Sequence, residues 1–453
     1  MKHPEQEQKM SPESPQDGAS LLRTSVAPLP ELSELQSRAA VRSARLSGGQ
    51  VRPLYGSYCF SSIPGLIEKT LLGGTSRDCP AWLSAQPMGD FNRVVFIFFD
   101  AFGWESLEKF RDTSRALRRF SSDGLILQTT SQFPSTTAAH VTTALSGKSA
   151  YQHEVCGWDY YEPRAGRVIR PLKFSDPFST EAGTLSKLGL TPKGVLPAGD
   201  FLSKIAGSGC SVQLHGPAAY FPSEFSSNYV DGKLVTGYSS IEQGLTNVSE
   251  SLRSTNGPAY HYLYVDSYDT ACHKEGVGSK SANLVAKDVL GHIARFIERD
   301  RYGKTLLVLS ADHGQIADKP ECSLTLQNVF PSITQYLKRD PSGEVIRFSG
   351  GARYLFLHVV EDAIAPVIAQ LQTKLSGAAT IWTTEELSNA GFLGPLPVPE
   401  SYRERLGTVA ILPEPGYSVR WHEPPLFAKS EYSGHGGVSP QEMETPLILY
   451  PFS

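Results

Sequence analysis

The chain has 453 residues, with 42 basic and 46 acidic side chains and a formal net charge of -4 at pH 7. A charge this close to neutral argues against a nucleic-acid partner and against a membrane-surface protein. Hydrophobic residues make up 40% of the chain, enough for a large buried core, and no apolar run is long enough to span a membrane.

Residues 1–50 are rich in Glu, Gln, Ser, Pro and Ala and contain no apolar stretch of signal-peptide length. We therefore expect a disordered N-terminal tail. The six cysteines are scattered along the chain without a CxxC pair. This pattern favours reduced thiols in a cytoplasmic protein over a disulfide framework.

Between residues 51 and 314 the predicted strands and helices alternate. Strands are expected at Arg93–Phe99, Gly124–Thr130, Cys210–Leu214, Tyr260–Val265 and Thr305–Leu309. Helices are expected at Ile63–Gly73, Trp104–Phe120, Thr137–Leu145, Phe201–Ala206, Ile241–Leu252 and Ala282–Arg299. Several of the strands are continuous apolar runs, typical of strands buried on both faces. The alternation predicts an α/β fold whose central sheet is mostly parallel, with helices on both faces.

The pattern changes between residues 315 and 425. Strands are expected at Arg353–Val359, Ala379–Trp382 and Thr408–Pro413, and a helix at Asp362–Leu375. We interpret 315–425 as an inserted α+β cap, after which the chain returns to the main sheet with a strand at Pro446–Tyr450. The catalytic domain would then comprise residues 51–314 and 426–453. The insertion follows directly after His313, so we expect it to influence leaving-group specificity. Exchanging the cap should change the rank order of substrates more than the metal content, and unchanged preferences would contradict this.

A carboxylate and an imidazole occur together twice in this sequence. Asp312 and His313 are adjacent at the end of a predicted strand, where both can hold one divalent ion. Asp269 and His273 are four residues apart, so a helical segment would place them on one face, although such pairs also arise by chance. His435 lies in a Ser-Gly-His-Gly-Gly loop, which could also be a plain surface turn.

Asp100, at the end of the first predicted strand, completes a set of three aspartates and three histidines, although an Asp there could instead cap the following helix. These nitrogen and oxygen ligands suit two adjacent divalent ions, with a preference like that of zinc or manganese. Two metals about 3.5–4 Å apart form the clamp used for in-line displacement at phosphorus. A threonine at the start of the predicted helix would attack as an activated hydroxyl. The first backbone N–H groups of that helix would bind the phosphate oxygens.

Four motifs carry a resemblance to a known family. They are Phe133-Pro-Ser-Thr-Thr137, Asp269-x3-His273-x2-Gly276, Asp312-His313-Gly314 and His435-Gly436-Gly437. In this order, with Asp100 upstream, they resemble the alkaline phosphatase superfamily and, within it, the nucleotide pyrophosphatase/phosphodiesterase branch. The resemblance extends from about Tyr55 to Tyr450.

The resemblance implies a role for each matching residue. Thr137 matches the nucleophile, Thr136 stands where relatives often carry Lys, and turnover would pass through a phospho-threonine. The residues that match the site of the activating metal are Asp100, Asp312 and His313. Those that match the second metal site, which binds a phosphoryl oxygen and then the attacking water, are Asp269, His273 and His435. Asp266 would orient one of these ligands.

One position departs from the family pattern. After His153-Glu-Val-Cys-Gly157, the phosphodiesterases of the family usually carry an Asn that hydrogen-bonds a non-bridging phosphate oxygen, whereas this chain has Trp158 and then Asp159. The departure leaves the preference for diesters over monoesters open. Trp158 forms either an aromatic wall for an apolar or base-like part of the substrate, or a part of the core.

The resulting prediction is a cytoplasmic hydrolase with two divalent ions, zinc or manganese, that cleaves phosphodiester or pyrophosphate bonds of a small phosphate ester or nucleotide. A sulfatase is disfavoured because no Cys-x-Pro-x-Arg run exists, and a cofactor-independent phosphoglycerate mutase would use a serine. A phosphonate hydrolase would keep Thr137 and every ligand, so the motifs leave this alternative open. A phosphomonoesterase is also open, because its phosphate-clamping Arg cannot be located from the sequence. A non-catalytic ligand-binding module is a further alternative, which the complete ligand set disfavours.

Overall fold

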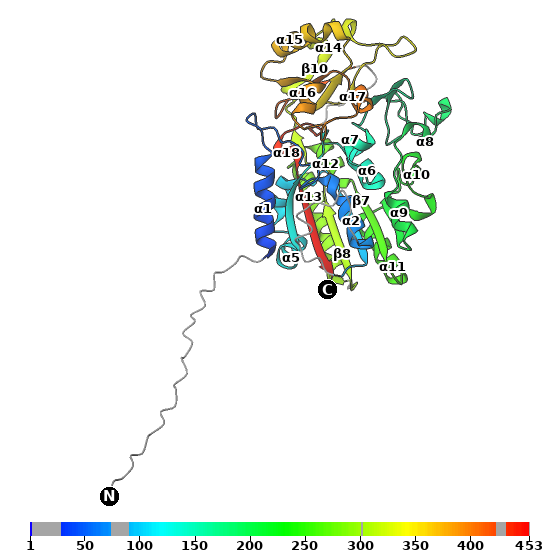
Figure 1. Ribbon diagram of the computed structural model, residues 1–453, viewed down its shortest axis with the longest axis vertical. Coiled ribbons are helices and arrows are strands. Elements are labelled where there is room, and N and C mark those ends of the chain that lie inside the picture. Colours follow the sequence, from blue (N-terminus) through cyan, green and yellow to red (C-terminus); the bar gives the residue numbers. More distant parts are fainter. Residues whose placement is uncertain (2–28, 74–89, 300–301, 423–431, 453) are drawn as a thin grey trace.

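The computed structural model describes residues 1, 29–73, 90–299, 302–422 and 432–452 (Figure 1). A large sheet covered by helices forms the main body. A smaller unit, coloured yellow to orange in Figure 1, lies at one end of it. Within the described residues, no helix is long and apolar enough to cross a membrane.

The central sheet has seven strands in the order β2-β17-β8-β1-β7-β5-β6. Their bounds are β1 Arg93–Phe99, β2 Leu125–Thr130, β5 Ser211–Pro217, β6 Val235–Tyr238, β7 Ala259–Val265, β8 Thr305–Ser310 and β17 Glu444–Phe452. Strands β8, β1, β7, β5 and β6 pair in parallel, whereas β17 pairs antiparallel with both β8 and β2. The prediction of a mostly parallel sheet is therefore confirmed.

Helices cover both faces of this sheet. Those of the main body are α1 Leu29–Ser43, α2 Ile63–Leu72, α4 Trp104–Phe110, α5 Arg115–Asp123, α6 Thr137–Ser146, α7 Ala150–His153, α8 Pro192–Val195, α9 Phe201–Gly207, α10 Glu224–Ser227, α11 Ile241–Ser254, α12 Ser267–Glu275, α13 Lys280–Arg299 and α18 Pro440–Met443. Phe96 and Phe98 of β1 belong to one core with α2, α6 and α9, whereas Ile97 and Phe99 belong to the other with α5, α11 and α13. Burial on both faces explains why the strand is apolar at every position.

The predicted disordered tail is wrong for residues 29–50, because α1 folds against the edge strand β2. The residues that α1 and the following turn bury are Ser33, Ser37, Val41 and Ala44. The hydroxyl of Ser37 accepts a hydrogen bond from the backbone N–H of Gln128, 3.0 Å away, which satisfies a donor of the sheet edge. A contact face made of serine and small apolar residues has no hydrophobic signature, so composition concealed the helix. Residues 2–28 of the predicted tail lie outside the described residues.

The single helix predicted over Trp104–Phe120 is two helices, α4 and α5. Ser114 ends the turn between them and caps α5, because its Oγ accepts from the backbone N–H of Leu117, 3.3 Å away. The local sequence Asp-Thr-Ser favours this break, since such side chains stabilise helix N-termini better than helix interiors.

The smaller unit is built on a four-stranded antiparallel sheet in the order β11-β12-β14-β13. Its strands and helices are β11 Ser349–Gly351, β12 Tyr354–Leu357, β13 Ala379–Thr383, β14 Val409–Pro413, α14 Leu326–Val329, α15 Ile364–Lys374, α16 Thr384–Asn389 and α17 Glu400–Leu406. These elements lie between β8 and β17 in the chain. One face of the small sheet and α15 form a separate core, whereas α16 and α17 pack into a core of the main body. An α+β insertion is thus present, and its boundary at 425 lies outside the described residues.

Short elements connect the larger ones. The strand pairs are β3 Tyr160–Glu162 with β4 Arg167–Ile169, β9 Ile316–Ala317 with β16 Ser433–Gly434, and β10 Ser323–Thr325 with β15 Ser418–Arg420. The 3-10 helices are η1 Phe60–Ser62, η2 Ser186–Leu188, η3 Gly232–Leu234, η4 Pro320–Cys322, η5 Ile333–Tyr336 and η6 Glu361–Ala363. The β9–β16 pair matters for function, because it joins the segment after His313 to the segment before His435.

Candidate active site

The predicted metal ligands come together at the carboxyl ends of three neighbouring strands. Asp100 follows β1, Asp312 and His313 follow β8, and β7 leads into α12, which carries Asp269 and His273. Strands β8, β1 and β7 are adjacent and parallel, so these chain segments leave the sheet at one edge. Ligands of parallel α/β proteins bind at this edge.

Thr137 is the first residue of α6, and its hydroxyl lies among the first group of ligands. Its Oγ1 lies 3.1 Å from Nε2 of His313 and 3.5 Å from Oδ2 of Asp100. The same Nε2 of His313 lies 3.1 Å from Oδ2 of Asp312. All four side chains are buried. The structure therefore brings the predicted nucleophile to the residues predicted to hold its activating metal.

The second predicted group also forms a cluster. Because α12 is helical, Asp269 and His273 share one face, with His273 Nε2 3.4 Å from Asp269 Oδ1. Nε2 of His435 lies 4.0 Å from the same carboxylate oxygen. The ring of His435 stacks on that of His313, with centroids 3.7 Å apart, so the two groups adjoin.

All three histidines present the same ring nitrogen to the cluster. The Nδ1 atoms of His273, His313 and His435 lie 2.9–3.0 Å from the backbone carbonyl oxygens of Ser433, Gly314 and Ser135 respectively. A carbonyl oxygen only accepts, so each Nδ1 carries the proton and donates it, and Nε2 is then the ring nitrogen that can bind a metal. This is the usual arrangement of histidines that bind metal.

Each carboxylate of the first group has a buried oxygen without a hydrogen-bond partner in the described part of the chain. Oδ1 of Asp100 and Oδ2 of Asp312 have no hydrogen-bond partner among the described residues. Burial, together with the nearby charges of Asp312 and Asp269, holds the pKa of Asp100 well above its usual range. A divalent cation would relieve both problems. Each of the two groups offers three nitrogen or oxygen atoms within 4.8 Å of one another, so both fit such an ion.

Sequence reasoning missed two residues that contact the ligands. Tyr264, on β7, donates a hydrogen bond to Oδ2 of Asp100. Gln315 donates through Nε2 to Oδ1 of Asp269. Gln315 follows His313 by two residues, and proximity to a motif was its only signal. In the sequence, nothing distinguishes Tyr264 from the other residues of a buried strand.

Gly314 allows two segments of backbone to approach closely. A Cβ atom at this position would overlap the backbone carbonyl of Gln441 and would press on Gly103. The glycine is therefore required by the close approach of α18 to the segment after β8. Its backbone does not adopt the left-handed conformation.

Asp266 and Thr136 border the two groups without belonging to them. Asp266 precedes α12, and burial raises its pKa while a hydrogen bond with Tyr220 opposes that shift. Thr136 is the residue before α6, is buried, and lies near the hydroxyl of Tyr354, whose pKa it lowers. Both positions suit residues that orient ligands or substrate, which remains a prediction.

Trp158 is 39% exposed, so the core reading of this residue is wrong. The guanidinium of Arg170 lies over its ring, 5.7 Å from the centroid. Arg170 is in turn held by a two-pronged ion pair with buried Asp159, at 2.8 and 2.9 Å. The indole is therefore an exposed aromatic surface on a fixed support, as a substrate wall requires.

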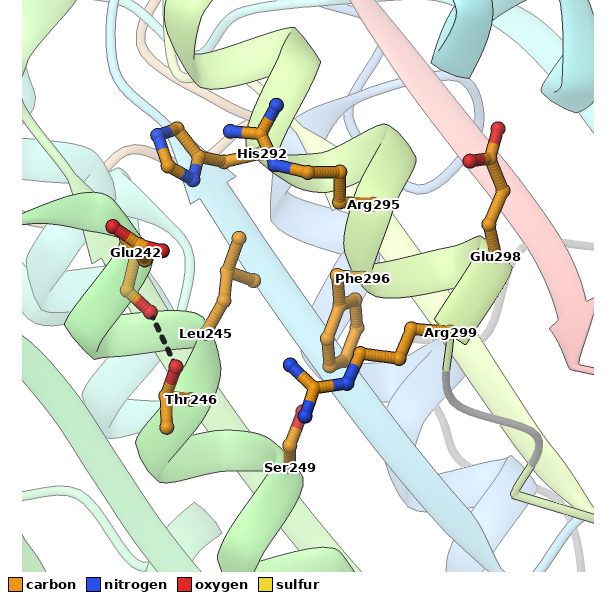
Figure 2. Close-up of a pocket in the computed structure, with 9 residues that line it drawn as sticks. All are labelled: Glu242, Leu245, Thr246, Ser249, His292, Arg295, Phe296, Glu298 and Arg299. Atoms are coloured by element: carbon orange, nitrogen blue, oxygen red, sulfur yellow. Dashed lines mark hydrogen bonds between the residues drawn. The ribbon is translucent and has the colours of Figure 1, made fainter.

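A hollow of about 350 Å³ lies between α11 and α13, away from these clusters (Figure 2). It is lined by Glu242, Leu245, Thr246, Ser249, His292, Arg295, Phe296, Glu298 and Arg299. None of these belongs to the predicted ligand groups, and Arg295 and Arg299 are exposed. The hollow is therefore separate from the candidate site at the strand ends.

The parallel sheet and the aspartate–histidine clusters at its edge define a member of the alkaline phosphatase superfamily. More narrowly, residues 94–437 match the family model of type I phosphodiesterase / nucleotide pyrophosphatase, and the chain belongs to this family. Membership indicates hydrolysis of phosphoric esters. Among curated proteins, none is significantly similar in sequence.

Solved structures share the fold at low sequence identity. Human ectonucleotide pyrophosphatase/phosphodiesterase 5 is 16% identical, with a TM-score of 0.57 over 79% of this chain and 87% of that chain. The murine protein gives a TM-score of 0.53 at the same identity and coverage. Phosphonoacetate hydrolase from Sinorhizobium meliloti is 16% identical, with a TM-score of 0.53 over 79% of this chain and 89% of that chain. These likenesses establish the fold alone.

Proposed function

We propose that the protein is a two-metal hydrolase of phosphodiester or pyrophosphate bonds that acts through a phospho-threonine intermediate. The observation that carries the proposal is the position of Thr137 Oγ1, 3.1 Å from His313 and 3.5 Å from Asp100, at the start of α6. A hydroxyl beside a cation-binding group and at a helix N-terminus is suited to attack phosphorus.

The residues of the chain would divide the work as follows. Two bound divalent ions would supply the positive charge that lowers the pKa of the hydroxyl and stabilises the phosphoryl oxygens. Thr137 would give its hydroxyl proton to solvent as its oxygen bonds to phosphorus, and the bond to the leaving group would break as that group takes up a proton from solvent. Water then attacks the phospho-threonine, and the phosphorus–oxygen bond to Thr137 breaks to restore the hydroxyl. The first N–H groups of α6 donate to the phosphoryl oxygens throughout.

Zinc is the ion that we propose, with manganese as the second choice. The first group, Asp100, Asp312 and His313, would hold the ion that activates Thr137. The second group, Asp269, His273 and His435, would hold the other. The support is chemical: every donor is a carboxylate oxygen or an imidazole nitrogen, and each histidine offers Nε2.

The proposed substrate is a nucleotide or another small phosphodiester. Support comes from the family, and from a structure of an inactive variant of the murine relative in complex with AMP. A second candidate is phosphonate hydrolysis, because the phosphonoacetate hydrolase with this fold has been solved in complex with phosphonoacetate.

We also propose that the protein works in the cytoplasm. The support is that the described cysteines, four of them buried, are unpaired. Recovery of the native protein in a secreted or organelle-lumen fraction would contradict this.

The test is to assay bis(4-nitrophenyl) phosphate, 4-nitrophenyl phosphate and phosphonoacetate with zinc or manganese. We expect the diester to be cleaved fastest and Thr137→Ala to lower kcat by about 10³-fold or more. Acid quenching followed by mass spectrometry should find phosphate on Thr137. The matched control is Thr142→Ala, because Thr142 lies on the same helix and its hydroxyl bonds only the helix backbone.

Each other outcome selects a different reading. Faster cleavage of the monoester would reject the diesterase assignment and keep the threonine mechanism. Cleavage of phosphonoacetate alone would favour the second candidate. Bound metal without cleavage of any substrate would indicate a ligand-binding module.

A further inference from the structure

Tyr354, on β12 of the inserted unit, lies deep between that unit and the main body. It is 2% exposed. Glycines from three separate segments surround its ring. A Cβ atom at Gly157 would lie 3.1 Å from the ring, one at Gly351 3.0 Å, and one at Gly436 would overlap it. Gly436 follows His435, so the ring is wedged directly against the loop that carries a predicted ligand.

The hydroxyl of Tyr354 joins two parts of the candidate site. It accepts a hydrogen bond from the backbone N–H of Trp158, 3.1 Å away. The side chain of Thr136, the residue before the predicted nucleophile, also lies close enough to this hydroxyl to oppose the rise in its pKa that burial causes. One hydroxyl from the insertion therefore contacts the segment that departs from the family pattern and the residue that opens α6.

The segment around Trp158 is fixed by further contacts with the insertion. The backbone N–H of Gly350 donates to the carbonyl of Asp159, 2.7 Å away. The backbone N–H of Tyr161 donates to Oγ of Ser349, 2.9 Å away. These bonds lay residues 157–161 along the edge strand β11. Among the residues of the insertion that contact the Trp158 segment, Tyr354 is the one whose hydroxyl also lies near Thr136.

We infer that Tyr354 is a positioning residue of the catalytic site, through which the insertion fixes the hydroxyl of Thr136 and the Trp158 segment for the attack by Thr137. The inference rests on the proposed function. Its physical basis is that a reacting hydroxyl loses rate steeply when its surroundings shift by a fraction of an ångström. The ring fills the space between the glycines, whereas the hydroxyl connects the insertion with Thr136 and the Trp158 segment.

The test is Tyr354→Phe in the full-length, metal-loaded protein, because this change removes the hydroxyl and keeps the ring. We expect kcat for bis(4-nitrophenyl) phosphate to fall about tenfold, with KM changed less than about threefold and the content of bound zinc unchanged. Amide hydrogen exchange of residues 157–160 should speed up at least about tenfold, because the Trp158 N–H loses its acceptor. The control is Tyr302→Phe, which also removes one buried tyrosine hydroxyl. Tyr302 lies in the segment that precedes β8, and its hydroxyl donates to the backbone carbonyl of Ser249.

The outcomes separate the inference from the proposed function. Wild-type kcat together with wild-type exchange in Tyr354→Phe would overturn the inference. Loss of bound zinc would also overturn it, since Tyr354 would then support the metal site in general. If the wild-type protein cleaves no substrate, the proposed function fails, and the exchange measurement still decides whether Tyr354 holds the Trp158 segment.

Discussion

His215 on β5 and His261 on β7 lie side by side in the central sheet. Their ring centroids are 5.8 Å apart, and neither ring has a hydrogen-bond partner among the described residues. Burial lowers the pKa of His215 to about 4. Burial, with His215 and Arg93 nearby, lowers the pKa of His261 to about 3. Both rings are therefore neutral in the folded protein at neutral pH.

This pair predicts a loss of stability in mild acid. Unfolded histidine has a pKa of about 6.5, so the unfolded chain binds more protons than the folded chain between about pH 6.5 and pH 4. The free energy of unfolding must then fall as the pH falls, by about 1.4 kcal/mol per pH unit for each such histidine. We expect His261→Phe to reduce the change in the free energy of unfolding with pH by the contribution of one histidine. Urea unfolding of the metal-free protein from pH 7 to pH 5 measures this change. Exposed His422, replaced by Phe, is the control, and equal slopes in wild type and His261→Phe would contradict the argument.

At the scale of elements, sequence periodicity predicted the strands better than the helices that cover the sheet edge. β1 and β8 were predicted because a strand buried on both faces must be apolar throughout. Helix α1 was missed because two of the residues it buries are Ser33 and Ser37. A serine hydroxyl that accepts a hydrogen bond from an edge strand helps a helix to pack, yet serine is not hydrophobic. Its partner in the strand becomes known only when the fold is known.

The contact of α1 with β2 can be tested through Ser37. Ser37→Ala leaves the backbone N–H of Gln128 buried without its acceptor, so we expect the free energy of unfolding to fall by about 1–3 kcal/mol. Urea unfolding at pH 7 measures this. Ser43→Ala is the matched control on the same helix, because its exposed hydroxyl bonds only the helix backbone and should change stability by less than about 0.5 kcal/mol. A similar loss in both variants would mean that the hydrogen bond to the sheet edge is unimportant.

At the scale of the whole molecule, the candidate site combines segments that are far apart in the chain. Five of the six predicted ligands lie in short motifs, and Asp100 was predicted because it ends an apolar strand. Tyr264, Gln315 and Tyr354 were not predicted, because their partners are distant: Tyr264 reaches Asp100, and Tyr354 reaches from the insertion to Thr136. Local patterns predict the candidate metal-binding groups, whereas the residues that contact those groups depend on how distant segments of the chain pack together.

The insertion is also tied to the main body by a buried ion pair. Arg353 and Glu442 are 1% and 0% exposed and form two hydrogen bonds of 3.0 and 2.9 Å. The carboxylate of Glu442 additionally accepts from the backbone N–H of Gly437, 2.9 Å away and two residues after His435. One buried pair therefore connects the docking of the insertion with the loop that carries a predicted ligand.

Breaking this pair from one side should be more harmful than removing it. Arg353→Met leaves the Glu442 carboxylate buried without its cation, so we expect the free energy of unfolding to fall by about 3–5 kcal/mol. Glu442→Gln in the same chain removes the charge and keeps an oxygen acceptor for Gly437, so the double variant should regain part of this loss. Urea unfolding of both single variants and the double variant gives the coupling. Strictly additive losses would mean that the insertion is anchored by its apolar contacts, and that Arg353 acts only through the backbone carbonyls of Glu414 and Tyr417 to which it also donates.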